Sequence, residues 1–288
     1  MAMETFLIQL LNALQYGLLL FLVASGLTLI FGIMGIINLA HGSFYMMGAY
    51  MAFSLTALTD NLLIAVVLGV ALSALIGFLL EWALFSRLYK RDHLDQVLLT
   101  YGLILMFEEV RSMIVGDEVH GVGIPELLSA SIPLNDTLSY PVYRLFISGV
   151  CIALALLMYW LIRFTRLGMM IRAGSSNREM VQALGINIDL IYRIVFGLGV
   201  TLAAFAGMLA APVSSVYPGM GNQVLIICFV VVVIGGVGSV WGALVAAILI
   251  GLADTFGKVI VPDYAGLSVY VLMAAVLLWR PEGIFRRI

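Results

Sequence analysis

Side chains that could do chemistry are scarce in this sequence, and the first pair is Asn38 and His41. They are three positions apart, so a helix would place them on one face. Several glycines surround them, which indicates a bent or broken helix whose free backbone groups must line a cavity or be buried in protein. The residues of a possible substrate pathway or gate are Asn38, His41, Gly42 and Phe44. In the alternative, which we favour, Asn38 caps a helix and His41 lies at the level of lipid headgroups, satisfied by water or a carbonyl.

A second candidate is the glycine-rich stretch Gly235-Gly236-Val237-Gly238-Ser239. It lacks the Lys-Ser/Thr of a phosphate-binding loop, so we expect no nucleotide there. Small residues continue at intervals of four through Ala243, Ala247 and Gly251, and such residues let helices pack closely. We therefore favour a packing function for the stretch. In the alternative, Gly235, Gly236 and Gly238 form a break in the helix that lines a cavity of the substrate pathway.

Charged side chains offer pairing rather than catalysis. Two pairs have helical spacing: Glu108 with Arg111, and Asp254 with Lys258. Glu81 lies near a segment boundary, where we expect it to pair with Arg87 or turn outward. The sequence contains no Ser-His-Asp, paired-carboxylate or metal-ligand arrangement, so we expect neither enzymatic activity nor a metal site.

The elements that carry these residues are membrane segments. Hydrophobic residues make up 63% of the 288 positions and charged residues 10%, against about 25% charged residues in a soluble domain. A spanning helix needs about 20 apolar residues. Apolar segments cover residues 6–31, 36–58, 62–86, 97–115, 143–162, 190–212, 222–257 and 266–279. The seventh is too long for one crossing and is broken by the glycines, so it holds two passes or a pass plus a half-helix. The sequence predicts an all-α, polytopic transmembrane helical bundle of eight to ten segments, including broken or re-entrant helices, with residues 1–288 in one domain.

Two polar segments between the apolar ones, which we call joins, indicate which side of the membrane is cytoplasmic and which is external. The join at about 116–142 contains no Lys or Arg, whereas the join at about 163–189 contains Arg163, Arg166, Arg172 and Arg178. Cytoplasmic loops carry an excess of Lys and Arg. We therefore expect 163–189 to be cytoplasmic and 116–142 external. Alternating crossings then place eleven of the fourteen cationic residues, and the C-terminus, in the cytoplasm. The side of the N-terminus stays open.

The 163–189 join contains a short helix signal. Ser176 or Asn177 can cap a helix with Glu179 in its first turn, and Gly185 stands where a helix-ending glycine belongs. The apolar face of this helix would consist of Met180, Ala183 and Leu184. A helix of two turns is not stable alone. It either docks in a cleft of a partner protein or rests on lipid headgroups, and the residues leave both open.

Four motifs in the same order resemble the permeases of ATP-binding-cassette importers, in the branched-chain amino acid class. Gly168 to Gly185, continuing through Ile186-Asn187, resembles their coupling-helix loop. Asn38-Leu39-Ala40-His41-Gly42 with Met47-Gly48-Ala49-Tyr50 resembles their N-terminal signature. Gly235 to Ser239 with Gly242-Ala243, and the ending Arg280-Pro281-Glu282-Gly283-Ile284-Phe285, resemble their C-terminal features. One departure is Met180-Val181-Gln182, where the family usually has a more Ala-rich stretch.

The resemblance implies a permease subunit in the bacterial inner membrane. Its partners would be a second homologous permease, two ATP-binding subunits that hold the ATP and Mg²⁺, an external solute-binding protein and membrane lipid, with no nucleic acid and no cofactor of its own. The solutes implied are branched-chain or other hydrophobic amino acids, urea or short amides, and aromatic acids. The residues implied in ATPase coupling are Asn177, Arg178, Glu179, Met180, Ala183, Leu184 and Gly185.

Two other transport classes remain as alternatives. An ion-coupled secondary transporter would need acidic residues at mid-depth in the membrane, whereas the acidic residues here fall near segment ends. A passive small-solute channel would explain an apolar pathway but leaves the capped helix at 177–185 without a purpose.

Overall fold

A computed structural model describes residues 3–89, 91–133 and 139–285. The helices are α1 Met3–Met34, α2 His41–Thr59, α3 Leu62–Ala83, α4 His93–Val115, α5 Val142–Phe164, α6 Arg166–Ser176, α7 Arg178–Ala183, α8 Ile188–Ser214, α9 Met220–Gly235, α10 Val240–Ile260 and α11 Ala265–Trp279. Three short 3-10 turns, η1 Phe85–Arg87, η2 Glu126–Leu128 and η3 Pro262–Tyr264, join some of them, and β1 Ser131–Pro133 pairs antiparallel with β2 Ser139–Pro141.

Within the described residues, five helices are long and apolar enough to cross a membrane. They cover Thr5–Met34, Leu62–Arg87, Val142–Phe164, Ile188–Ser214 and Val240–Ile260, while α9 and α11 are apolar but shorter. The expected all-α, multi-pass membrane protein is confirmed, apart from the small β1–β2 hairpin. The number of crossings stays a prediction.

The long seventh apolar segment is divided as its glycines predicted. Helix α9 ends at Gly235 and α10 begins at Val240, and the connection passes through Gly236 and Gly238 with φ of 93° and 81°. Backbone at such φ angles is easily adopted only by glycine. The break between α1 and α2 likewise contains Gly35, at φ 69°.

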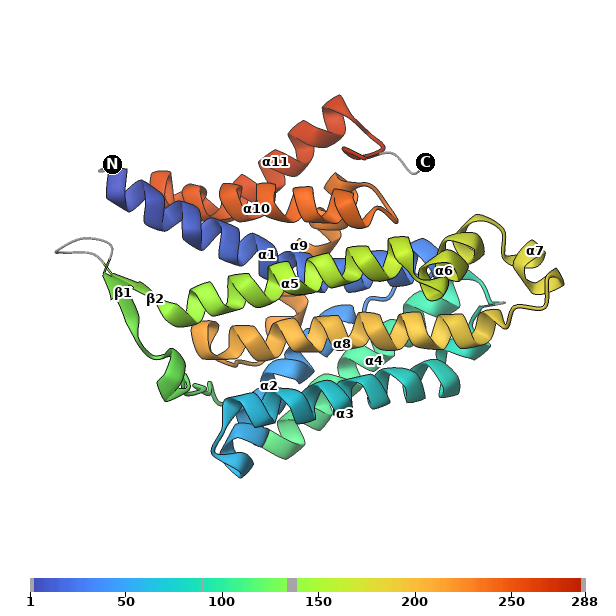
Figure 1. Cartoon of the computed structure of the whole chain (residues 1–288), viewed down its shortest axis with the longest axis horizontal. Helices are drawn as coiled ribbons and strands as arrows, with labels where there is room; N and C mark the ends of the chain where they lie inside the picture. Colours follow the sequence, from blue (N-terminus) through green and yellow to red (C-terminus); the bar gives the residue numbers. More distant parts are fainter. Residues whose placement is uncertain (1–2, 90, 134–138, 286–288) are drawn as a thin grey trace.

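Helices α1 and α8 form the centre of the bundle. In the 18-residue apolar window of each helix, the buried share is 83% for α1 and 78% for α8, but 17% for α5. α8 packs on α1, α2 and α3, and α1 packs on α10 (Figure 1). Small residues allow these contacts: a Cβ at Gly48 of α2 would overlap the carbonyl oxygen of Ala204 in α8. In lipid such close approach is a main source of helix–helix attraction.

The two polar joins lie at opposite ends of the bundle. The hairpin of the 116–142 join is at one end and α6 with α7 is at the other, and α5 runs between them (Figure 1). Two backbone hydrogen bonds of 2.8 Å attach the 116–142 join to the bundle: the His120 amide donates to the Val216 carbonyl, and the Val216 amide donates to the His120 carbonyl. The His120 ring also stacks on Phe53. Of the cationic residues counted at the cytoplasmic side, Lys90, Arg286 and Arg287 lie outside the described residues.

Candidate functional site

Helix α7 has the capped form that its sequence predicts. The Asn177 side chain accepts a hydrogen bond from the Met180 amide at 2.9 Å, so Asn177 is the cap. Ser176 is instead the last residue of α6. At the other end Gly185 has φ 81°, its amide donates to Gln182 at 2.9 Å, and the Ile186 amide donates to Val181 at 3.3 Å. These two bonds are those of the glycine-terminated helix end.

The apolar face of α7 points away from the bundle. Met180 is 58% exposed and Leu184 is 72% exposed, and Ala183 is exposed beside them. Only Val181, at 4%, is buried. The helix stands at the tip of the molecule (Figure 1), and its three apolar side chains are uncovered.

Arg178 points the other way, toward the bundle. Its guanidinium lies over the rings of Tyr89 and Tyr192, 5.5 and 5.1 Å from their centres. The two rings meet edge to face with centres 4.9 Å apart. A guanidinium over aromatic faces is attracted by the ring electrons, so this contact fastens the first turn of α7 to the bundle.

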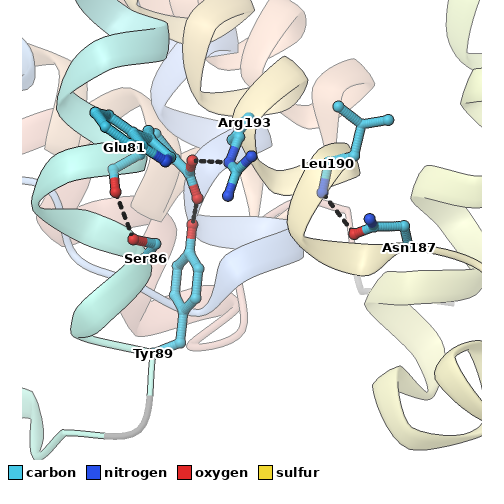
Figure 2. A network of polar contacts seen from close by, with 7 residues as sticks. Glu81, Ser86, Tyr89, Asn187, Leu190 and Arg193 are labelled. Atoms are coloured by element: carbon cyan, nitrogen blue, oxygen red, sulfur yellow. Dashed lines mark hydrogen bonds and ion pairs between the residues drawn. The ribbon is translucent and has the colours of Figure 1, made fainter.

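Behind Tyr89 lies Glu81, a fully buried carboxylate. One of its oxygens is 3.1 Å from Nε of Arg193, and the other accepts a hydrogen bond from the Tyr89 hydroxyl (Figure 2). Burial and the hydrogen bond to Glu81 raise the pKa of Tyr89, so the hydroxyl stays protonated and donates. A buried charge requires such partners, because leaving it unpaired is costly.

The expectation that Glu81 pairs with Arg87 or turns outward is therefore wrong. Helix α3 ends at Ala83, and the following turn directs Arg87 back to the carbonyl of that residue. Arg193 arrives from α8, which packs along α3. Sequence reasoning missed this contact because its partners are 112 positions apart.

Sequence reasoning also missed helix α6. Thr165 caps it by accepting a hydrogen bond from the Gly168 amide at 3.1 Å. Ile171 of this helix is buried while Arg166 and Arg172 are exposed. A Thr followed by apolar residues at helical spacing was the available signal. The join at 163–189 is thus two consecutive helices, with α7 presented at the end of α6.

The pair Asn38 and His41 lies in the protein interior. Both are fully buried. Nε2 of His41 is 2.8 Å from the carbonyl oxygen of Val23, and Asn38 accepts a hydrogen bond from the Ala40 amide at 3.1 Å. The expected carbonyl partner of His41 is present, but the ring is enclosed by protein instead of meeting headgroups. Asn38 does not cap a helix, because Ala40 stands at the cap position of α2 and no side chain bonds there.

Gly42 and Phe44 belong to the same packed region. A Cβ at Gly42 would overlap the carbonyl oxygen of Gly221 in α9. Phe44 is fully buried, with its ring against Phe107 and Phe196 at centre distances of 5.5 and 6.2 Å. These contacts give both residues a packing function, and their part in a substrate pathway stays a prediction.

The glycine-rich turn packs against the end of the chain. Ile284 and Phe285 donate backbone hydrogen bonds to Ile234 and Gly235, at 2.8 and 3.3 Å. A Cβ at Gly236 would overlap the carbonyl oxygen of Phe285. Two motifs that are distant in sequence, 235–239 and 280–285, thus form one contact. The favoured packing interpretation of these glycines fits this geometry.

A cavity of about 570 Å³ lies between α1, α5 and α10. Its walls are almost entirely apolar and include Leu11, Phe21, Ile152, Trp241 and Leu244. Asn38, His41 and Phe44 do not line it. Among the described residues no group of His, Cys, Asp or Glu could hold a metal ion.

The arrangement can be compared with known proteins. The family described as "Branched-chain amino acid transport system / permease component" matches residues 9–277. The high-affinity branched-chain amino acid transport system permease protein BraD of Pseudomonas aeruginosa is 29% identical, over 98% of this chain and 96% of that protein. The corresponding LivH of Escherichia coli K12 is 28% identical over the same shares. The probable permease LivH of Methanocaldococcus jannaschii is 28% identical over 95% of this chain and 90% of that protein. The chain belongs to the family of branched-chain amino acid transport permease components.

Proposed function

We propose that this chain is the membrane-spanning permease subunit of an ATP-driven importer for branched-chain and related hydrophobic amino acids. The family match and the names of the relatives support the solute class. The scarcity of charged residues supports an apolar pathway, which suits a solute with an aliphatic side chain.

The observation that carries the proposal is the outward apolar face of α7. A partner that covers Met180, Ala183 and Leu184 would remove them from water, and we assign that partner as an ATP-binding subunit. Glu179 is exposed at the rim of this face. Asn177 and Gly185 set the two ends of the helix. Arg178 contributes from the inner side, as an anchor and not as a contact surface. ATP and Mg²⁺ would be held by the partner.

We place the rest of the assembly at the two ends of the bundle. The arginine-rich end with α6 and α7 faces the cytoplasm together with the C-terminus, and the 116–142 join faces outward toward a solute-binding protein. A second homologous permease and two ATP-binding subunits complete the importer in the bacterial inner membrane. The crossings number eight to ten, as the apolar segments predict.

Copurification from cells that express the whole importer tests the assignment. Leu184→Asp places a charge on the exposed apolar face. Loss of a central interface side chain costs about 2 kcal/mol or more, so we expect the affinity for the ATP-binding subunit to fall about thirtyfold and less of it to copurify with the tagged chain.

The matched control is Leu127→Asp. Leu127 is 85% exposed at the opposite end of the bundle, in the 116–142 join. This variant should keep the wild-type amount of ATP-binding subunit. The assignment fails when the wild-type chain brings down no ATP-binding subunit, or when both variants retain it equally.

A further inference from the structure

Helix α7 is attached to the bundle by a chain of polar and aromatic contacts that leads into the membrane helices. We propose that Arg178, Tyr89, Glu81 and Arg193 form a linkage that carries a displacement of α7 to α3 and α8, with Arg178 and Tyr89 as positioning residues. This proposal rests on the proposed function, in which an ATP-binding subunit moves α7.

The first step of the linkage is the anchor on α7. Its principal packing partners are α6 and α8, its neighbours in sequence. Arg178 adds a third attachment, because Tyr89 belongs to the connection between α3 and α4. A movement of α7 that keeps the guanidinium over both rings must move this connection as well as the start of α8.

The second step joins the connection to the membrane helices. The hydroxyl of Tyr89 donates to Glu81 in α3, and the other oxygen of that carboxylate is 3.1 Å from Arg193 in α8 (Figure 2). Tyr192, the residue before Arg193, contributes the second ring under Arg178. The contacts therefore close on themselves: from α7 to Tyr89, to α3, to α8 and back to α7.

The third step is that this closed set moves as a unit. Glu81 is buried, so separating it from Arg193 or from Tyr89 would leave a charge poorly paired in a low-dielectric interior. When α7 is displaced, moving α3 and α8 together with the contacts intact then costs less free energy than breaking the contacts. The measure of such a linkage is the coupling between a contact in it and the movement of the helices it joins.

Tyr89→Phe is the sharpest perturbation. It removes one oxygen and keeps the ring under Arg178, and Glu81 retains Arg193, so the chain should fold. Tyr192→Phe is the matched control, because the Tyr192 ring contacts Arg178 and Tyr89 and no hydrogen bond of its hydroxyl is found among the described residues. The two variants lose the same atom from neighbouring rings.

The measurement uses the whole importer reconstituted in proteoliposomes. Spin labels at Leu79→Cys in α3 and Leu157→Cys in α5 report the distance between these helices, before and after Mg-ATP with vanadate. Both positions are exposed, and the native Cys151 and Cys228 are buried. Copurified ATP-binding subunit and ATP hydrolysis are measured on the same samples.

We expect Tyr89→Phe to keep its ATP-binding subunit and its ATP hydrolysis, while the equilibrium constant for the change in α3–α5 distance falls about tenfold. A tenfold effect is the scale of a lost hydrogen bond to a charged group. Tyr192→Phe should respond as the wild type does. A merely structural contact would lower assembly and hydrolysis together.

Three results would overturn the linkage. The first is a wild-type distance change in Tyr89→Phe, and the second is a joint loss of assembly and ATP hydrolysis in that variant. The third is an equal loss in Tyr89→Phe and Tyr192→Phe, since only Tyr89→Phe breaks the contact to Glu81. Failure of the proposed function is distinguishable, because the wild-type chain would then bring down no ATP-binding subunit at all.

Discussion

Replacing Gly48 by alanine tests how tightly α2 is held to α8. A Cβ at this position would overlap the carbonyl oxygen of Ala204 and come within 2.5 Å of its Cα, whereas ordinary contact begins at 3.4 Å. These are backbone atoms in the middle of a helix, so no side chain can turn aside. The two helices must separate locally by more than about 0.9 Å, which is the shortfall at the Cα, because the carbonyl oxygen lies closer still.

The net effect is the sum of two opposing contributions. Alanine in a helix interior is favoured over glycine by about 1 kcal/mol. Overpacking a tight contact costs about 1–3 kcal/mol, and more where backbone must move. With only backbone to displace, we expect a cost at the upper end of that range and a net loss of about 2 kcal/mol. At about 2–4 °C per kcal/mol, the midpoint of thermal unfolding should fall by about 4–8 °C.

The assay is thermal unfolding of the detergent-purified chain, with Gly102→Ala as control. Gly102 is an exposed helical glycine of α4, and a Cβ added there would meet no atom within 4 Å. Its replacement should raise the midpoint, because only the helix preference of alanine remains. If Gly48→Ala raised the midpoint as Gly102→Ala does, the close α2–α8 contact would be refuted.

Three further predictions concern polar contacts. Asn177→Ala removes the cap of α7 and should destabilise that helix by about 1 kcal/mol, which the proposed function predicts to be seen as weaker copurification of an ATP-binding subunit. Asn177→Asp should restore the cap and the copurification. Arg193→Leu leaves Glu81 buried without its cation, and thermal unfolding should show a loss of about 3 kcal/mol or more. The hydrogen bond from Arg111 lowers the pKa of Asp117. This contact is therefore complete above the ordinary carboxyl pKa of about 3.9 and is lost as the pH falls through the lower folded-state pKa. Hydrogen exchange near residue 117, corrected for its intrinsic rate, should accelerate only in that acidic range, and Asp117→Asn should show the faster rate already at pH 7.

The features that the sequence predicts well are those decided by neighbouring residues. The cap and the ending of α7 depend on contacts within a few positions: the sequence limits the cap to Ser176 or Asn177 and predicts the ending at Gly185. The pair Asp254 and Lys258, at 2.6 Å, and the pair Glu108 and Arg111, at 3.3 Å, are also local and confirmed. Membrane class and helix type follow equally from composition and segment length.

The features that the sequence does not predict depend on which helices pack against each other. The partner of Glu81 is decided by the packing of α3 on α8, which no spacing rule contains. The burial of His41 depends in the same way on α1, which supplies the carbonyl of Val23. Helix α6 is hard to predict for another reason: its arginines and glycines are typical of a loop, although Thr165 is a valid cap.

The packing of α8 decides which helices a movement of the proposed linkage would reach. In lipid, apolar side chains gain little by leaving the bilayer for another helix, so close backbone contacts hold helices together. α8 has such contacts on three sides: Gly199 against α1, Ala204 against Gly48 of α2, and Gly197 against Gly77 of α3. α5 has far less of its surface buried. In the proposed linkage, a displacement of α7 reaches a group of four tightly packed helices, and Glu81 with Arg193 joins two of them at the end where α7 is attached.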